Sequence, residues 1–204
     1  MTPVYKLSAN SVKNGRTVYG SMLAGNTAFV PPSFESIATV TVGGGGASTV
    51  NFTSIPGTYS HLEIRGVART ESASNSTENV GIRFNGDTGT NYTWHWVYTT
   101  GATPLIVAGS AGDNTSFVPR ITRDGTQTGT YALVKLSILD YVNTNKNKVM
   151  RSISGAALGG SQDVVWYSSG AWLSTNAITS ITLTPQSSNF KEHTTFALYG
   201  IKVS

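Results

Sequence analysis

Acid–base and metal chemistry depend on histidines and carboxylates, and this sequence of 204 residues contains few of either. Its three histidines are His61, His95 and His193. None of them belongs to a recognisable ligand spacing of histidines and carboxylates. The chain has no cysteine, which excludes thiolate ligands, thiol nucleophiles and disulfides. We therefore expect no metal site and no cofactor.

The carboxylates suit one enzyme class, the glycoside hydrolases, which need two of them on opposite sides of a sugar. Glu63 lies in an alternating strand pattern, whereas Glu71 and Glu78 flank a Ser/Asn-rich loop. Nothing in the sequence fixes any pair of them in space. A Gly-X-Ser-X-Gly nucleophile elbow is also missing, and Gly43–Gly46 lacks the Lys-Ser/Thr of a phosphate-binding loop. We expect no catalytic residues and no enzyme activity, with glycan hydrolysis as the alternative.

Two aspartates lie in glycine- and asparagine-rich segments that could bind calcium. Asp87 belongs to Asn85-Gly86-Asp87-Thr88-Gly89, and Asp113 lies between Gly112 and Asn114. Neither segment has the repeated oxygen donors of a calcium loop. Asn and Asp side chains commonly stabilise turns by bonding to the nearby backbone. The sequence favours turns at both places.

Aromatic side chains are the other group that could bind a ligand. The four tryptophans are Trp94, Trp96, Trp166 and Trp172. In an extended strand, Trp94 and Trp96 share one face with Tyr92 and Tyr98. Flat rings suit the C–H faces of sugars, so the tryptophans could stack on a glycan. Aromatic residues also bury much area in a core or at an oligomer contact, and the sequence favours this interpretation while glycan stacking stays open.

Composition and charge describe the chain as a whole. With 39% hydrophobic and 12% charged residues, it lacks the low hydrophobicity and high charge of disordered proteins. The sequence contains no signal-peptide pattern and no apolar run of membrane-spanning length. Residues 1–34 hold three basic residues and no acidic ones, which leaves 11 basic and 10 acidic residues in the rest. The body is thus nearly neutral, and we expect no nucleic-acid partner.

The first 34 residues differ from the rest and predict an N-terminal arm, separated at the prolines of residues 30–33 from a domain over 35–204. Its apolar residues include Tyr5, Leu7, Val18, Met22, Leu23 and Phe29. An arm this apolar is expected to dock, either on its own body or on another subunit.

Residues 35–204 show about a dozen short strand patterns separated by turns, with no convincing helix. This predicts an all-β fold, a single β-sandwich of jelly-roll type. Residues 37–42 and 49–52 flank Gly43–Gly46 and are expected to pair as a hairpin. Asn85-Gly86-Asp87 predicts a tight turn.

Two stretches carry a resemblance to a known group of proteins. The first comprises SIATVTV at 36–42 and IPGTYSHLEIRG at 55–66. The second comprises ITSITLT at 178–184, Asn189-Phe190 and FALYGIK at 196–202. Together they resemble tailed-bacteriophage virion structural proteins of the fibre, appendage or decoration type. Residues 70–175 do not match closely, and no functional residue carries over.

The resemblance implies a setting rather than a chemistry. It implies a virion protein assembled in the host cytoplasm, displayed on the particle exterior and anchored to other virion proteins by its arm. Analogy with fibres and decorations suggests a homotrimer. The alternative is a carbohydrate-binding module that adsorbs to a host-surface glycan.

Overall fold

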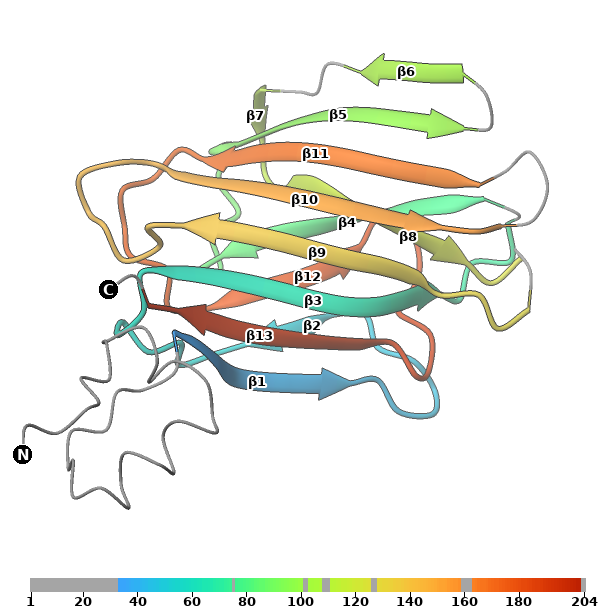
Figure 1. Ribbon diagram of the computed structural model, residues 1–204, viewed down its shortest axis with the longest axis horizontal. Coiled ribbons are helices and arrows are strands. Elements are labelled where there is room, and N and C mark those ends of the chain that lie inside the picture. The colour runs from blue at the N-terminus through green and yellow to red at the C-terminus, as the bar shows by residue number, and fades with distance from the viewer. Residues whose placement is uncertain are drawn as a thin grey trace, which may run out of the picture.

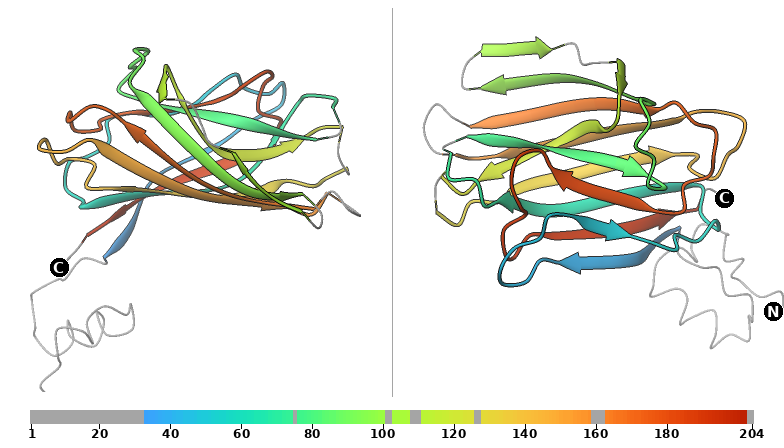
Figure 2. Two further views of the ribbon diagram at one scale, coloured as in Figure 1. Left: turned by 90° about the horizontal axis from the view of Figure 1, so that it is seen from above. Right: turned by 180° about the vertical axis from the view of Figure 1, so that it is seen from behind.

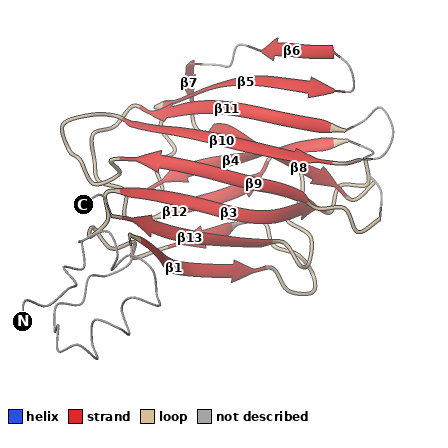
Figure 3. Cartoon of the chain, in the orientation of Figure 1, coloured by secondary structure: helices blue, strands red, loops and turns tan. Residues whose placement is uncertain are grey.

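The computed structural model of the chain describes residues 33–74, 76–100, 103–107, 111–125, 128–158 and 163–202. The described part contains strands and no helix, which confirms the all-β prediction (Figures 1 and 3). The strands are β1 (Phe34–Thr41), β2 (Val50–Phe52), β3 (His61–Thr70), β4 (Thr77–Phe84), β5 (Tyr92–Thr100), β6 (Thr103–Val107), β7 (Ala111–Asp113), β8 (Ser116–Arg123), β9 (Ala132–Leu139), β10 (Lys148–Ala156), β11 (Val164–Trp172), β12 (Ile181–Pro185) and β13 (Thr195–Ile201).

These strands form two facing layers (Figure 2). The larger layer has the order β1-β13-β3-β9-β10-β11-β5-β6, and every pair in it is antiparallel. The smaller layer has the order β2-β12-β4-β8. Its strand β8 lies against β9, β10 and β11 of the larger layer. At one end, β8 also pairs in parallel with the last residues of β3, so the two layers belong to one continuous hydrogen-bonded sheet.

Alternating side chains build the core between the layers. In β9, Val134, Leu136 and Ile138 are fully buried while the residues between them point outward. The smaller layer contributes Val80, Ile82 and Phe84 of β4 in the same manner, as their spacing predicts. Burial of these side chains is the main stabilising contribution of the fold.

The expected hairpin across Gly43–Gly46 does not form. Strand β1 pairs with β13 in the larger layer, whereas β2 pairs with β12 in the smaller one. The glycine segment therefore connects the two layers, and its Gly45 and Gly46 have the positive φ angles that favour glycine. Local sequence could not reveal this, because the partners of β1 and β2 lie more than 100 residues away.

The turn predicted at residues 85–87 is confirmed. Asn85 and Gly86 have φ angles of 53° and 68°, as the tight hairpin turns with Asn-Gly require. The Asp87 amide donates to the Phe84 carbonyl at 2.9 Å. The Asn85 side chain also accepts from the amides of Thr179 and Ser180 at 2.8 and 3.1 Å, which ties this turn to the segment before β12.

Candidate functional site

The outward side of the larger layer is the most unusual surface among the described residues. It exposes apolar side chains from β3, β5, β9, β10 and β11, each between 42% and 59% accessible. These residues, which we call the outer face, are Val67, Val97, Leu133, Leu139, Val149, Ile153, Val165 and Tyr167. Figure 1 is viewed onto the layer that carries them.

Strand register brings most residues of the outer face side by side. Val67 is directly opposite Leu133. In the neighbouring row, Ile153 is opposite Tyr167, which is opposite Val97. Opposite residues in antiparallel strands lie within side-chain contact distance. These two rows place apolar residues on five adjacent strands, whereas Leu139 and Val149 lie beyond a polar row that contains Ser137, Arg151 and Ser169.

The outer face also carries a small charged group. The buried carboxylate of Glu63 accepts from Arg65 Nε at 2.7 Å, and Lys135 Nζ lies 3.3 Å from its other oxygen. Arg65 also lies over the rings of Phe34 and Tyr199, at 4.8 and 5.6 Å from their centroids. One carboxylate thus offsets part of the charge of two cations, which reduces the positive charge of the surface.

Lys135 separates two hollows of the outer face, each about 450 Å³ in volume. One is lined by Leu139, Ile153 and Tyr167 and the other by Val67, Leu133 and Tyr199. Both hollows are mainly apolar in lining, although Lys135 lines both of them, Arg151 lines the first and Arg65 lines the second. Hollows of this kind can receive protruding apolar side chains of a partner surface.

Strands β9, β10 and β11 therefore expose apolar residues on the side that faces away from the core, although polar residues such as Lys135 and Arg151 lie among them. An antiparallel sheet with one solvated side normally places polar residues there. Monomeric soluble proteins rarely expose contiguous apolar patches of more than a few hundred Å². Sequence analysis missed this surface, although the alternation of Leu133 and Leu139 with the buried positions of β9 was a readable signal.

The tryptophans proposed for glycan stacking lie mostly inside. Trp96, Trp166 and Trp172 are 8%, 3% and 2% exposed, and Trp94 is half-buried. Trp94 and Trp96 stack on each other, and Trp166 stacks on Tyr98. A buried ring offers no face to a sugar, so this geometry argues against stacking by the three buried tryptophans. Stacking by Trp94 stays a prediction.

Asp87 and Asp113 serve as acceptors for tryptophans. Trp172 Nε1 donates to Asp87 at 2.7 Å, and Trp94 Nε1 donates to Asp113 at 2.6 Å. Asp87 also accepts from the Asn91 side chain at 2.9 Å and the Gly89 amide at 2.8 Å. Hydrogen bonds from Asn91 first and Trp172 second lower the pKa of the Asp87 carboxyl. The donors to Asp87 stabilise its turn and the core, in agreement with the turn interpretation, whereas Asp113 is the last residue of strand β7 and not a turn residue.

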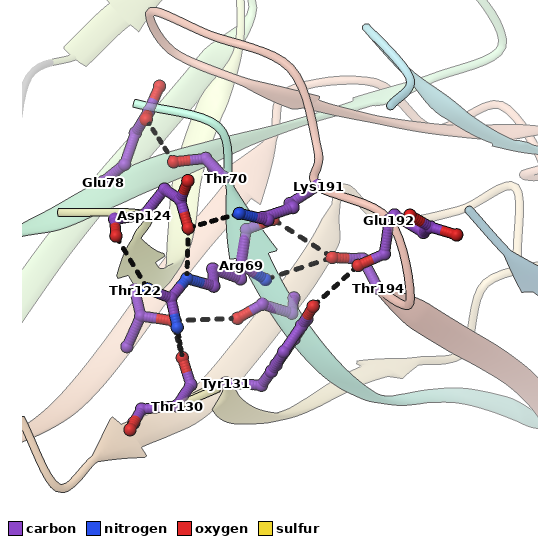
Figure 4. A network of polar contacts seen from close by, with 11 residues as sticks. Arg69, Thr70, Glu78, Thr122, Asp124, Thr130, Tyr131, Lys191, Glu192 and Thr194 are labelled. Carbon is purple, nitrogen blue, oxygen red and sulfur yellow. Dashed lines mark hydrogen bonds and ion pairs between the residues drawn. The ribbon is translucent and has the colours of Figure 1, made fainter. Parts of the chain in front are cut away.

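A buried polar network joins the two layers where β3 meets β8 (Figure 4). The Arg69 side chain is almost fully buried and donates to the carbonyls of Asp124 and Thr130 at 2.8 and 3.0 Å. Its Nε lies 3.2 Å from the Asp124 carboxylate, which Lys191 also contacts. The hydrogen bond from Lys191 is the main cause that lowers the pKa of Asp124. These groups connect β3, β8 and the segment before β13, which indicates a structural role.

The carboxylates considered for hydrolysis are engaged by neighbouring groups. Glu78 accepts from the hydroxyls of Thr70 and Ser188 at 2.8 and 2.9 Å and lies 3.5 Å from Arg123. The Glu71 carboxylate accepts from the Asn189 side chain at 3.2 Å. Glu63 belongs to the charged group of the outer face. None of these contacts arranges two carboxylates around an open site.

The remaining predictions concern metal binding by histidines, membrane spans and the arm. His61 Nδ1 accepts from the Asp140 amide at 3.0 Å, and no three His, Asp or Glu residues of the described chain could jointly hold a metal ion. Among the described residues, no helix is long and apolar enough to cross a membrane. The proposed arm-docking residues Tyr5 to Phe29 lie outside the described residues, which begin at Ser33 beside Lys202.

Comparison of the chain with protein-family models, curated proteins and solved structures finds no match.

Proposed function

We propose that this protein is a structural subunit of a bacteriophage particle, which assembles with copies of itself through the outer face. The apolar outer face supports this proposal most strongly, because water-exposed Val, Leu and Ile on five adjacent strands favour burial against a partner. The resemblance of residues 36–66 and 178–202 to virion proteins suggests the particle. In this setting the chain forms a short fibre, an appendage or a decoration, with three copies around an axis.

Copies of the same chain suit this surface for two physical reasons. Exposed apolar residues predominate over charged ones, as in the core of homo-oligomer interfaces. Glu63 already offsets charge on Arg65 and Lys135, which lowers the repulsion between two like surfaces. The body is displayed outward, and the arm of residues 1–34 anchors it to neighbouring virion proteins.

A charge at the centre of the outer face tests the assembly. Ile153 lies opposite Lys135, so Ile153→Arg would place two cations side by side in any interface that buries them. Thr184→Arg on the outward side of β12 is the matched control. We expect sedimentation velocity to give an oligomer for the wild type and Thr184→Arg, and mainly monomer for Ile153→Arg. An unchanged mass for Ile153→Arg would contradict assembly through this face.

Glycan binding is the second candidate, and Tyr167 now favours it more than the tryptophans do. Tyr167 is 51% exposed and borders a hollow that also has Lys135, Ser137 and Arg151 in its wall. An exposed ring beside hydrogen-bond donors can bind a sugar. Tyr167→Ala should then abolish retention on host-surface polysaccharide while leaving the native mass unchanged. Loss of oligomer in the same variant supports assembly instead.

A further inference from the structure

A small cavity at one end of the molecule lies between the two layers, away from the outer face. It has a volume of about 160 Å³, equivalent to roughly five water molecules. Ser76, Thr77, Tyr98, Arg120 and Trp166 line it. Leu158 and Val164 complete the wall.

Arg120 brings a positive charge to this cavity without a carboxylate partner. Its Nε donates to Thr77 Oγ1 at 3.0 Å, and Nη2 donates to the Thr77 carbonyl at 3.3 Å. No carboxylate of the described residues forms an ion pair with it; Glu78, on the strand that pairs with β8, bonds to Thr70, Ser188 and Arg123 instead. A guanidinium has five N–H donors, and the hydrogen bonds of Arg120 to the described residues engage only Nε and Nη2.

Aromatic rings hold the guanidinium in place. Its carbon lies 4.3 Å from the centre of the Trp166 ring and 5.7 Å from that of Trp96. The ring of Trp166 also stacks on the ring of Tyr98, with centroids 4.2 Å apart. Burial is the main cause that lowers the pKa of Arg120 to about 10, and the nearby charge of Glu78 offsets only part of this effect.

A second donor at the same place has no acceptor. Trp166 is 3% exposed, and its buried Nε1 has no hydrogen-bond partner among the described residues. The other three tryptophans each donate to an oxygen, including Trp96 to the Phe117 carbonyl at 2.6 Å. Buried N–H groups are nearly always paired, so an unpaired one indicates a missing acceptor.

We propose that this cavity binds a small oxyanion, either a free inorganic one or the carboxylate of an acidic sugar, through Arg120 and Trp166. An anion supplies both things that the cavity lacks, a negative charge beside the guanidinium and oxygen acceptors for the unpaired N–H groups. Water would provide acceptors but no charge. The site lies on the inward side of the larger layer and does not depend on the assembly role of the outer face.

The indole N–H signals of the four tryptophans in ¹⁵N–¹H spectra test this site directly. The full chain is titrated separately with phosphate, acetate and glucuronate at constant ionic strength, with glucose as the uncharged control. We expect a saturable shift of the Trp166 signal, identified by its loss in Trp166→Phe, with little change at Trp172. Tightest saturation by phosphate identifies a free inorganic oxyanion, whereas glucuronate that saturates much more tightly than phosphate and acetate identifies an acidic sugar.

Arg120→Met should weaken the binding by about tenfold or more, because it removes charge-assisted hydrogen bonds. Arg151→Met, at an exposed arginine of the outer face, is the matched control and should leave binding unchanged. The signals of Trp94 and Trp172 report whether Arg120→Met is folded, and Arg120→Lys provides a second variant that keeps the charge. Arg120→Lys should therefore bind more tightly than Arg120→Met. The proposal is overturned if the Trp166 signal shows no saturable shift with any anion, or if folded Arg120→Met binds as tightly as the wild type and Arg151→Met do.

Discussion

At the residue scale, single side chains in this protein mainly stabilise turns and the core. Asp87 is a clear case, since its carboxylate receives donors from Asn91, Trp172 and the Gly89 amide. The turn itself could be predicted, because Asn-Gly accepts positive φ angles at low cost. The bond from Trp172 could not, because it joins residues 85 positions apart and depends on the tertiary fold.

The lowered pKa of Asp87 predicts a contribution to acid lability. An unperturbed aspartate has a pKa of 3.8, and that of folded Asp87 is lower, so the unfolded chain binds the proton more readily. Its contribution is therefore complete above that ordinary pKa and is lost as the pH falls through the folded value. Asp87→Asn should make unfolding less dependent on pH in this acid range, as measured by urea denaturation at several pH values. Glu192→Gln, at an exposed carboxylate, should leave the dependence unchanged.

Lys148 offers a second test at this scale. Its side chain is fully buried, and Nζ donates to the carbonyls of Asn143, Lys146 and Thr175 at 2.6, 2.9 and 2.9 Å. Lys148→Met should lower the free energy of unfolding by about 3 kcal/mol, because these carbonyls lose their donor. The exposed Lys146 forms a surface ion pair with Asp140, and Lys146→Met should cost less than about 1 kcal/mol. Equal effects of the two substitutions in denaturant titrations would refute this role.

At the element scale, alternation predicted most strands but not their partners. Residues 62–64, 80–84 and 134–138 lie on the faces that their spacing indicates. The pairing of β3 with both β13 and β9 joins segments far apart in sequence. Register of this kind depends on tertiary packing. For the same reason, the local hairpin expected at Gly43–Gly46 was wrong.

Strand β9 allows its two faces to be compared with one kind of substitution. Leu136 is 1% exposed, so Leu136→Ala should leave a cavity and lower stability by about 2–5 kcal/mol. Leu133 is 59% exposed in the single chain, so Leu133→Ala should change the stability of an isolated subunit by at most about 0.5 kcal/mol. It should nevertheless weaken the oligomer, which concentration-dependent sedimentation would show. An unaffected oligomer in Leu133→Ala would argue against burial of this position.

Arg69 also stabilises the connection between the two layers. Arg69 links the end of β3 to Asp124 after β8 and to Thr130 before β9 (Figure 4). Arg69→Met should lower the free energy of unfolding by about 3–5 kcal/mol, since it breaks a buried ion pair and leaves carbonyls without donors. Arg65→Met on the outer face should cost far less, because its side chain is 53% exposed. Thermal or urea unfolding of both variants measures the difference.

At the scale of the whole molecule, the fold is a two-layered β body with one unusually apolar side. The pattern of alternating residues predicted the all-β class, because many short strands without helical periodicity are compatible with few other fold classes. The outer face could not be assigned from β9, β10 or β11 singly, since each strand's outward residues become a patch only when the register aligns them. The sequence analysis predicted that most aromatic residues are buried. It could not predict that Trp94 is the tryptophan that remains half-buried, because this depends on how the two layers pack.

Coverage of the outer face in the assembled protein is the central claim, and the chain provides a direct way to measure it. Because the sequence contains no cysteine, a single Val165→Cys on the outer face or Thr184→Cys on the smaller layer reports one position alone. The rate of maleimide labelling would be compared between native protein and protein dissociated by dilution. We predict that Val165→Cys is protected in the native assembly and becomes reactive on dissociation, whereas Thr184→Cys keeps one rate throughout. Equal, rapid labelling of Val165→Cys in both states would show that the outer face is open to solvent and would contradict the proposed assembly.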